Sequence, residues 1–289
     1  MRLSTPPAPV DVAAIFPELA DQVKTTVRLH PRRGAPAITD SSMGGPLLWP
    51  ADEAWPYCEA SEHADPSGLW GRVAMVPVLQ LYARDTPELP FPAGADLCQV
   101  LWCPVTHRPD HVPVLYVAWR DSRLVAKVLA KAPEPVESEK EYLPSPCVLS
   151  PERVREYPSV WVLPAELDKK VAEWSDSSHN PEEWSYQDHL STAPGTKVGG
   201  WVDWIQDPIS MECDRGHEMS HLLTIASWEH DGGSDKRWVP LEEQHLLGPH
   251  QVSELQEPAG IMIGDAGSMY VFTCLECSDR PVETASQCS

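Results

Sequence analysis

The stretches that decide the fold are SSMGGPLLWP at residues 41–50 and TKVGGWVDWI at residues 196–205. Both contain the motif Gly-Gly-x-x-x-Trp, at Gly44, Gly45 and Trp49 and at Gly199, Gly200 and Trp204. Paired glycines permit a positive φ or a close approach of two backbones, and a following indole ring can cover the turn. The two stretches therefore predict the same local turn at two places in the chain.

Apolar, strand-like runs follow each stretch in the same order. VPVLQL (76–81) and LCQVLWC (97–103) follow the first stretch, and HLLTIA (221–226) and SMYVFTC (268–274) follow the second. Because similarity in order and type indicates repeated units, the sequence predicts an internal duplication. The expected fold class is α+β, with mainly antiparallel strands in two pseudo-equivalent halves and few short helices.

Proline shapes the rest of the organisation. The chain of 289 residues has 31 prolines, which are poorly tolerated inside helices and central strands. Pro17 is expected to split the apolar pattern of residues 11–24 into two short turns, and a helix is predicted from Pro164 to about Trp174. We expect a β-rich N-terminal half with short N-terminal helices (1–131), an acidic, proline-rich connection with a helix (132–195) and a β-rich C-terminal half with a Cys-x-x-Cys motif (196–289).

The formal charge of −21 disfavours two kinds of partner. Phosphate backbones and anionic lipid headgroups are repelled by such a protein, so we expect no nucleic-acid partner and no membrane partner. The N-terminus lacks a signal-peptide core, and no apolar run reaches the ~20 residues of a membrane helix. These features favour a cytoplasmic protein whose eight cysteines are reduced.

Four residues of the C-terminal half have the chemistry of a structural zinc site. Cys274 and Cys277 have the spacing that brings two thiolates to one tetrahedral Zn²⁺, with Cys213 and His217 as the other ligands. The alternative is a group of buried core cysteines, since only one pair has clean spacing and Cys103, which aligns with Cys274, belongs to no Cys-x-x-Cys. Both interpretations stay open, and the sequence commits the protein to no cofactor.

The stretch HEMSH at residues 217–221 matches the His-Glu-x-x-His motif. On a helix it would form a zinc peptidase centre in which Glu218 activates water, with Glu242 or Glu243 as a third metal ligand. The repeat places residues 222–226 on a strand instead, where two histidines four residues apart do not chelate one ion as they do on a helix. We therefore interpret the match as coincidental and predict no catalytic residues.

Several motifs resemble the YwqG-like family, bacterial proteins that share a domain of unknown function. They are MGGPLLWPADEAWP, VPVLQL, LPFP, KVGGWVDWIQ and GDAGSMYVFTCLEC, and the resemblance extends from Ser41 to Cys288. The C-terminal half is also distantly similar to the programmed cell death protein 2 family, whose members act as chaperones or adaptors for a ribosomal protein. In such relatives a Cys-x-Cys-Gly-x-x-Met stretch precedes the Leu-Leu-Thr-Ile strand, whereas this chain has Arg215 in place of the second cysteine. The resemblance implies protein binding.

Tryptophans and glycines near the two turns are candidate binding residues. Tryptophan is favoured at binding hot spots, and aromatic residues with prolines can form a groove for an extended peptide. The candidates are Trp49, Trp55, Gly199, Gly200, Trp201 and Trp204, and the alternative is that the tryptophans cap the core of each half. The predicted function is a non-enzymatic, adaptor or chaperone-like protein with a protein or peptide partner. A toxin-neutralising, immunity-type protein and the zinc peptidase are the alternatives.

Overall fold

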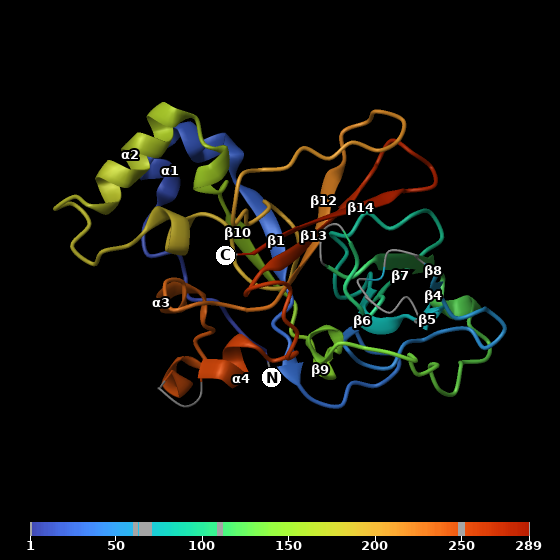
Figure 1. The fold of residues 1–289 in the computed structure, drawn as a ribbon. Helices are drawn as coiled ribbons and strands as arrows, with labels where there is room; N and C mark the ends of the chain where they lie inside the picture. The colour runs from blue at the N-terminus through green and yellow to red at the C-terminus, as the bar shows by residue number, and fades with distance from the viewer. Residues whose placement is uncertain (1, 60–62, 64–70, 109–111, 248–251, 289) are drawn as a thin grey trace.

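Most strands of the computed structural model belong to two six-stranded sheets. The structure describes residues 2–59, 63, 71–108, 112–247 and 252–288. Short helices lie around the sheets (Figure 1). The expected α+β class, with mainly antiparallel strands and few short helices, is confirmed. In the described part of the chain, no helix is long and apolar enough to cross a membrane.

Sheet A contains the strands of the C-terminal half and two earlier strands. Its order is β10 (Glu152–Glu156), β1 (Lys24–Arg28), β11 (Lys197–Gly199), β12 (Ser220–Ala226), β13 (Ser268–Thr273) and β14 (Val282–Gln287). All neighbouring strands are antiparallel. The strands predicted at 221–226 and 268–274 are therefore confirmed as β12 and β13.

Sheet B contains five strands of the N-terminal half and one strand, β9, of the connection. Its order is β2 (Arg32–Arg33), β9 (Cys147–Val148), β3 (Ser42–Met43), β6 (Val76–Tyr82), β7 (Leu97–Trp102) and β8 (Leu115–Arg120). A separate hairpin joins β4 (Tyr57–Cys58) to β5 (Val73–Ala74). The strands predicted at 76–81 and 97–103 are confirmed as β6 and β7.

The two sheets agree in register as well as in strand order. The pairing shifts between Pro77 and Leu79 at the start of β6, and it shifts between His221 and Leu223 at the start of β12. Such bulges bend a strand locally. The last residue of β7 lies opposite the first of β6, and the last residue of β13 lies opposite the first of β12. Cys103 and Cys274, which directly follow these strands, therefore occupy corresponding positions.

In each sheet, one strand pairs with a strand that lies much later or much earlier in the chain. β1 precedes the first glycine pair in the chain but pairs with β11, and β9 precedes the second glycine pair but pairs with β3. The main hydrophobic core also contains residues of both sheets, including Val78, Val100, Leu223 and Val271. Each sheet thus needs strands from both parts of the chain.

Short helices cover one side of sheet A. α1 (Val12–Ile15) and the 3₁₀ helix η1 (Pro17–Gln22) meet at Pro17, and α2 (Ala165–Ser175) follows Pro164, as predicted. These elements lie together in Figure 1 and share a small apolar cluster that includes Phe16. The remaining helices are η2 (Ser122–Leu124), η3 (Lys140–Tyr142), η4 (Val160–Val162), the π-helical η5 (Tyr186–Leu190), α3 (Asp235–Trp238), η6 (Gln244–Leu246) and α4 (Val252–Gln256).

The glycine pairs occupy turns that require glycine, as expected. Gly44 has φ 61° and Gly199 has φ 62°, in the left-handed region that other residues rarely adopt. Gly200 has φ 75° and is also crowded, because a Cβ there would lie 2.0 Å from Oε1 of Glu156. The second glycine pair therefore allows β11 to pass close to a buried carboxylate.

That carboxylate belongs to a fully buried ion pair. Lys197 on β11 and Glu156 on β10 have side chains that are 0% exposed, and Nζ of the lysine lies 2.8 Å from Oε2 of the glutamate. The backbone N–H of Ala193 also donates to this carboxylate, at 2.7 Å. Because a buried charge is costly unless it is paired and hydrogen-bonded, this arrangement is a strong constraint on sheet A.

Candidate metal centres

The four metal-ligand candidates of the C-terminal half come together in the structure. We call Cys213, His217, Cys274 and Cys277 the C-terminal cluster; one ligand atom from each lies within 4.8 Å of all the others. Sγ of Cys213 is 3.9 Å from Sγ of Cys277. Nδ1 of His217 is 3.3 Å from Sγ of Cys277 and 3.6 Å from Sγ of Cys274. The three cysteines are buried.

Two turns bring these side chains to the same end of sheet A. Cys213 and His217 flank a tight turn in which Gly216 has φ 75°. The backbone N–H of Cys213 donates to the carbonyl of His217 at 3.0 Å, which closes this turn. Cys274 directly follows β13, and Cys277 lies in the connection to β14. Ligands far apart in the chain therefore meet because β12 and β13 are paired.

The surroundings of Cys213 favour the thiolate, which is the form that binds metals. Burial raises the pKa of Cys213, but hydrogen bonds from the backbone N–H groups of His217 and Arg215 and from the other two thiols outweigh it, and the pKa falls to about 7. Burial and the thiol of Cys274 raise the pKa of Cys277. A bound cation would stabilise all three sulfurs as thiolates.

The donor set fits zinc. In a tetrahedral site with Zn–S bonds of about 2.3 Å and Zn–N bonds of about 2.0 Å, neighbouring ligand atoms are about 3.5 to 3.8 Å apart. Three separations between ligand atoms of the C-terminal cluster, 3.3, 3.6 and 3.9 Å, agree with this geometry. Arg215 lies outside the cluster and pairs with Asp279 at 2.8 Å. His217 supplies the fourth donor.

Sequence reasoning missed a second group of the same kind. We call Cys58, His63, Cys103 and His107 the N-terminal cluster; their ligand atoms also lie within 4.8 Å of one another. The available signal was the pair of short spacings, Cys58-x-x-x-x-His63 and Cys103-x-x-x-His107. The sequence interpretation of Cys103 as a core cysteine is incomplete, because Cys103 belongs to a Cys/His cluster.

The residues of the His-Glu-x-x-His match lie on a turn and a strand. His217 belongs to the C-terminal cluster, whereas His221 lies in β12 and its Nε2 is 3.0 Å from Oγ1 of Thr224. The two histidines therefore have different partners. Of the proposed third ligands, Glu243 pairs with Arg32, and Glu242 accepts a hydrogen bond from the backbone N–H of Ser4. This geometry does not support the peptidase interpretation.

The tryptophan candidates lie mainly inside the protein. Trp49 and Trp55 pack against each other in one apolar cluster, with ring centroids 5.0 Å apart, and are 1% and 7% exposed. Trp204 is 8% exposed and packs against Tyr270 in another cluster. Trp201 is half-buried beneath Nζ of Lys24. Trp49 and Trp55 thus share one apolar cluster, Trp204 belongs to another, and Trp201 belongs to neither.

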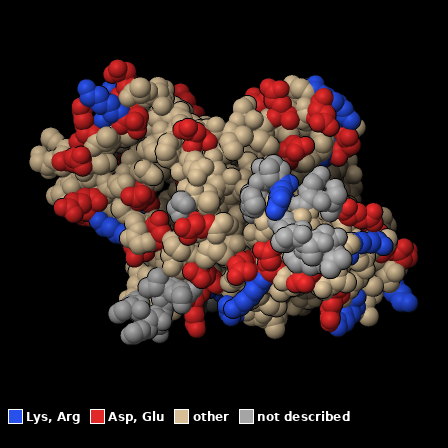
Figure 2. All heavy atoms as spheres, in the orientation of Figure 1, with Lys and Arg blue, Asp and Glu red and all other residues tan. Residues whose placement is uncertain are grey.

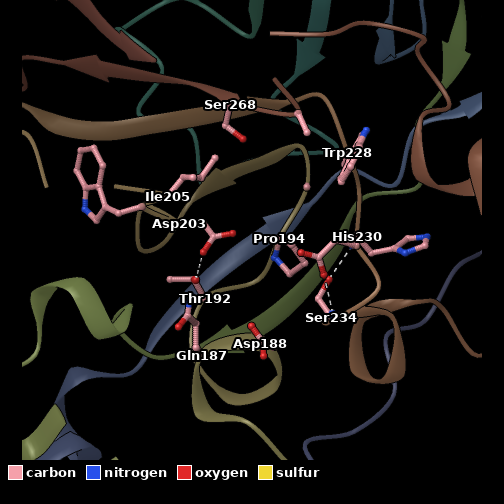
Figure 3. A pocket seen from close by; sticks show the side chains of 14 residues that line it. Gln187, Asp188, Thr192, Pro194, Asp203, Ile205, Trp228, His230, Ser234 and Ser268 are labelled. Atoms are coloured by element: carbon pink, nitrogen blue, oxygen red, sulfur yellow. Dashed lines mark hydrogen bonds between the residues drawn. The ribbon is translucent and has the colours of Figure 1, made fainter. Parts of the chain in front are cut away.

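A polar hollow of about 230 Å³ is lined by residues of the connection (132–195) and of the C-terminal half (Figure 3). Asp203 and Thr192 line it, and the threonine hydroxyl donates to the carboxylate at 2.5 Å. Burial raises the pKa of Asp203 to about 6, although Lys197 and Thr192 act in the opposite direction. The lining residues include no member of either cluster. Trp204, a candidate binding residue of the sequence analysis, is among the residues that line this hollow.

This protein is classified here by its fold and by its two Cys/His clusters. No protein-family model matches this chain, and a search of curated proteins found no similar sequence. The structure defines the class as an antiparallel, two-sheet protein with a Cys/His cluster associated with each sheet.

Proposed function

We propose that the C-terminal cluster holds a structural zinc ion and that the protein is a non-enzymatic, protein-binding adaptor. The observation that carries this proposal is the convergence of three cysteines and one histidine within 4.8 Å. A structural zinc site has four protein ligands, whereas a catalytic site keeps one position open for water or substrate. A complete set of four protein donors therefore favours a structural role.

The zinc ion would join two connections of sheet A that are also linked by the ion pair of Arg215 and Asp279. Cys213 and His217 lie in the connection between β11 and β12, and the other two ligands lie in the connection between β13 and β14. A metal ion that links both connections would hold them in one conformation. Rigid loops lose less conformational entropy when they bind a partner, which suits an adaptor.

The repeated architecture and the family resemblance support the adaptor assignment. The matching strand order, bulges and cysteine positions of the two sheets favour the internal duplication that we propose as the origin of the fold. The distant similarity of the C-terminal half to the programmed cell death protein 2 family favours protein binding. Neither the repeated architecture nor the family resemblance points to a catalytic group.

The exposed side chain of Leu275 is the contact that we propose for the partner. It lies between the two cysteines of the Cys-x-x-Cys turn and is 44% exposed. Its neighbour Glu276 is exposed, and so is Asp214 in the facing turn. Figure 2 shows Asp and Glu spread over one face of the molecule, in keeping with the formal charge of −21. These features favour a partner segment with an apolar residue beside basic ones.

The zinc proposal predicts the metal content of two variants. Cys277→Ser removes one thiolate from the C-terminal cluster and is expected to lower the bound zinc by one ion per chain. His221→Ala, which changes the other histidine of the His-Glu-x-x-His match, is expected to leave the zinc content unchanged because His221 contacts Thr224. Elemental analysis of untagged, dialysed protein measures both. Equal zinc content in wild type and Cys277→Ser would refute the proposal.

The adaptor proposal predicts that partner binding depends on Leu275. Wild type is expected to retain a stoichiometric protein partner from native lysate, and Leu275→Asp is expected to weaken that binding at least about tenfold, equivalent to ~1.4 kcal/mol. Leu241→Asp is the matched control, because Leu241 is 51% exposed and lies outside the cluster. Quantitative affinity purification with mass spectrometry gives the ratio. Equal recovery with both variants would exclude Leu275 as the contact.

A further inference from the structure

We infer that the N-terminal cluster is a second zinc site, formed by Cys58, His63, Cys103 and His107. Nε2 of His107 is 3.2 Å from Sγ of Cys58. Nε2 of His63 is 3.5 Å from Sγ of Cys103. Both separations are close to the ~3.5 Å expected between sulfur and nitrogen ligands of one tetrahedral Zn²⁺. The donor set differs from that of the C-terminal cluster, with two cysteines and two histidines.

The histidines present their ring nitrogens as zinc ligation requires. In both rings Nε2 faces sulfur, while the buried Nδ1 has no hydrogen-bond partner among the described residues. A neutral imidazole that carries its proton on Nδ1 has its lone pair on Nε2, and this lone pair binds a metal. The ring centroids of His63 and His107 are 4.7 Å apart, and one ligand nitrogen of each ring lies within 4.8 Å of the other and of both sulfurs.

The position of this cluster in sheet B matches that of the C-terminal cluster in sheet A. Cys58 and His63 lie in the connection between β3 and β6, and Cys103 and His107 lie in the connection between β7 and β8. The corresponding connections of sheet A supply the C-terminal cluster. Two groups with metal-ligand geometry at corresponding places are difficult to explain as independent accidents of core packing.

Burial favours a metal over a reactive cysteine–histidine pair. Cys103 is 0% exposed, Cys58 is 3% exposed and His107 is 4% exposed. A nucleophilic cysteine must reach its substrate, whereas these thiols are closed off from solvent. Two thiolates balance the charge of Zn²⁺, so the complete site is neutral and suits a buried position. The same ion would also fasten the β4–β5 hairpin, where Cys58 pairs with Val73, to the end of β7.

The test is the zinc content of the full-length, untagged protein. Wild type is expected to bind two zinc ions per chain, and Cys103→Ser and Cys274→Ser are each expected to bind one. Cys98→Ser is the control. Cys98 lies in β7 and is as deeply buried as Cys103, but it belongs to neither cluster. It is expected to keep both ions. Elemental analysis after dialysis gives the ratio, and circular dichroism verifies that each variant is folded.

The outcomes separate this inference from the proposed function. A single zinc ion that Cys274→Ser removes and Cys103→Ser retains would overturn the second site and leave the C-terminal site intact. A single ion with the opposite behaviour would support the second site and refute the C-terminal one. Wild type without zinc would overturn both.

A cobalt titration of the metal-free wild type provides a measurement that does not depend on folded variants. Co²⁺ replaces Zn²⁺ in tetrahedral sites, and its sulfur-to-metal absorption grows with the number of thiolate ligands. Two equivalents are expected, one with the stronger absorption of three thiolates and one with the weaker absorption of two. Saturation at one equivalent, with the spectrum of three thiolates alone, would overturn the second site.

Discussion

Lys197→Met is expected to lower the free energy of unfolding by about 3 to 5 kcal/mol, the usual cost of breaking a buried ion pair. Methionine keeps much of the side-chain volume but leaves the carboxylate of Glu156 buried without its cation. Asp203 also loses a favourable charge, because Lys197 acts against the burial that raises the pKa of this carboxyl. Urea unfolding followed by circular dichroism measures the difference.

The stability that Lys197→Met loses relative to wild type is also expected to depend on pH. Burial raises the pKa of Asp203 to about 6 against the opposing charge of Lys197, so without Lys197 this carboxyl is expected to bind protons still more readily in the folded state than in the unfolded state. Folding then takes up protons, so the stability deficit relative to wild type is expected to shrink as the pH falls from 8 towards 5. The double variant Lys197→Met, Glu156→Gln removes both charges and is expected to recover part of the loss. A double variant as unstable as the sum of the single variants would show that the pair is not coupled.

Gly200→Ala is expected to destabilise the protein by about 3 kcal/mol or more, because two penalties combine. The left-handed conformation with φ 75° costs an alanine roughly 1 to 2 kcal/mol. The new Cβ would also lie 2.0 Å from Oε1 of Glu156, so the buried carboxylate must move. Its movement would disturb the hydrogen bond from the backbone N–H of Ala193. Thermal unfolding and urea unfolding both report the loss.

Gly199→Ala is the matched control for this prediction. Gly199 has φ 62°, but no atom lies within 4 Å of a Cβ added there. Only the conformational penalty applies, and we expect a loss of roughly 1 to 2 kcal/mol. Equal effects of the two substitutions would mean that the Glu156 contact contributes nothing. Since both glycines were also candidate binding residues, reduced partner binding without reduced stability would favour the binding role instead.

Local sequence patterns were sufficient to predict the main strands and the principal helix. The apolar runs at 76–81 and 221–226 have β-rich composition and lie in the same order after each glycine pair, and both form strands. Pro164 marks the start of α2 because its ring suits the first turn of a helix. These signals depend on neighbours in the chain. The π-helical turn at Tyr186–Leu190 lies in the connection at 132–195 and was not predicted, because it lacks such a signal.

The candidate metal sites were also predictable only where their ligands lie close together in the chain. Cys274 and Cys277 were predicted because their spacing alone brings two thiols together, and Cys213 and His217 lie near each other for the same reason. In the N-terminal cluster, Cys58 and Cys103 lie far apart in the chain and neither belongs to a Cys-x-x-Cys motif. Each cysteine has a histidine close to it in the chain, His63 and His107, but the two pairs meet only when sheet B and its connections are assembled.

The sequence by itself determined the glycine turns, the strand runs, the proline-bounded helices and one metal-ligand spacing, since each depends on contacts between residues close in the chain. Only the tertiary structure decided that β1 and β9 exchange between sheets and that Glu156 is buried beside Lys197. It also brought the four residues of the N-terminal cluster together. These features depend on long-range pairing, whose free energy comes from burying the shared core, and no local pattern encodes which distant partner a strand will select.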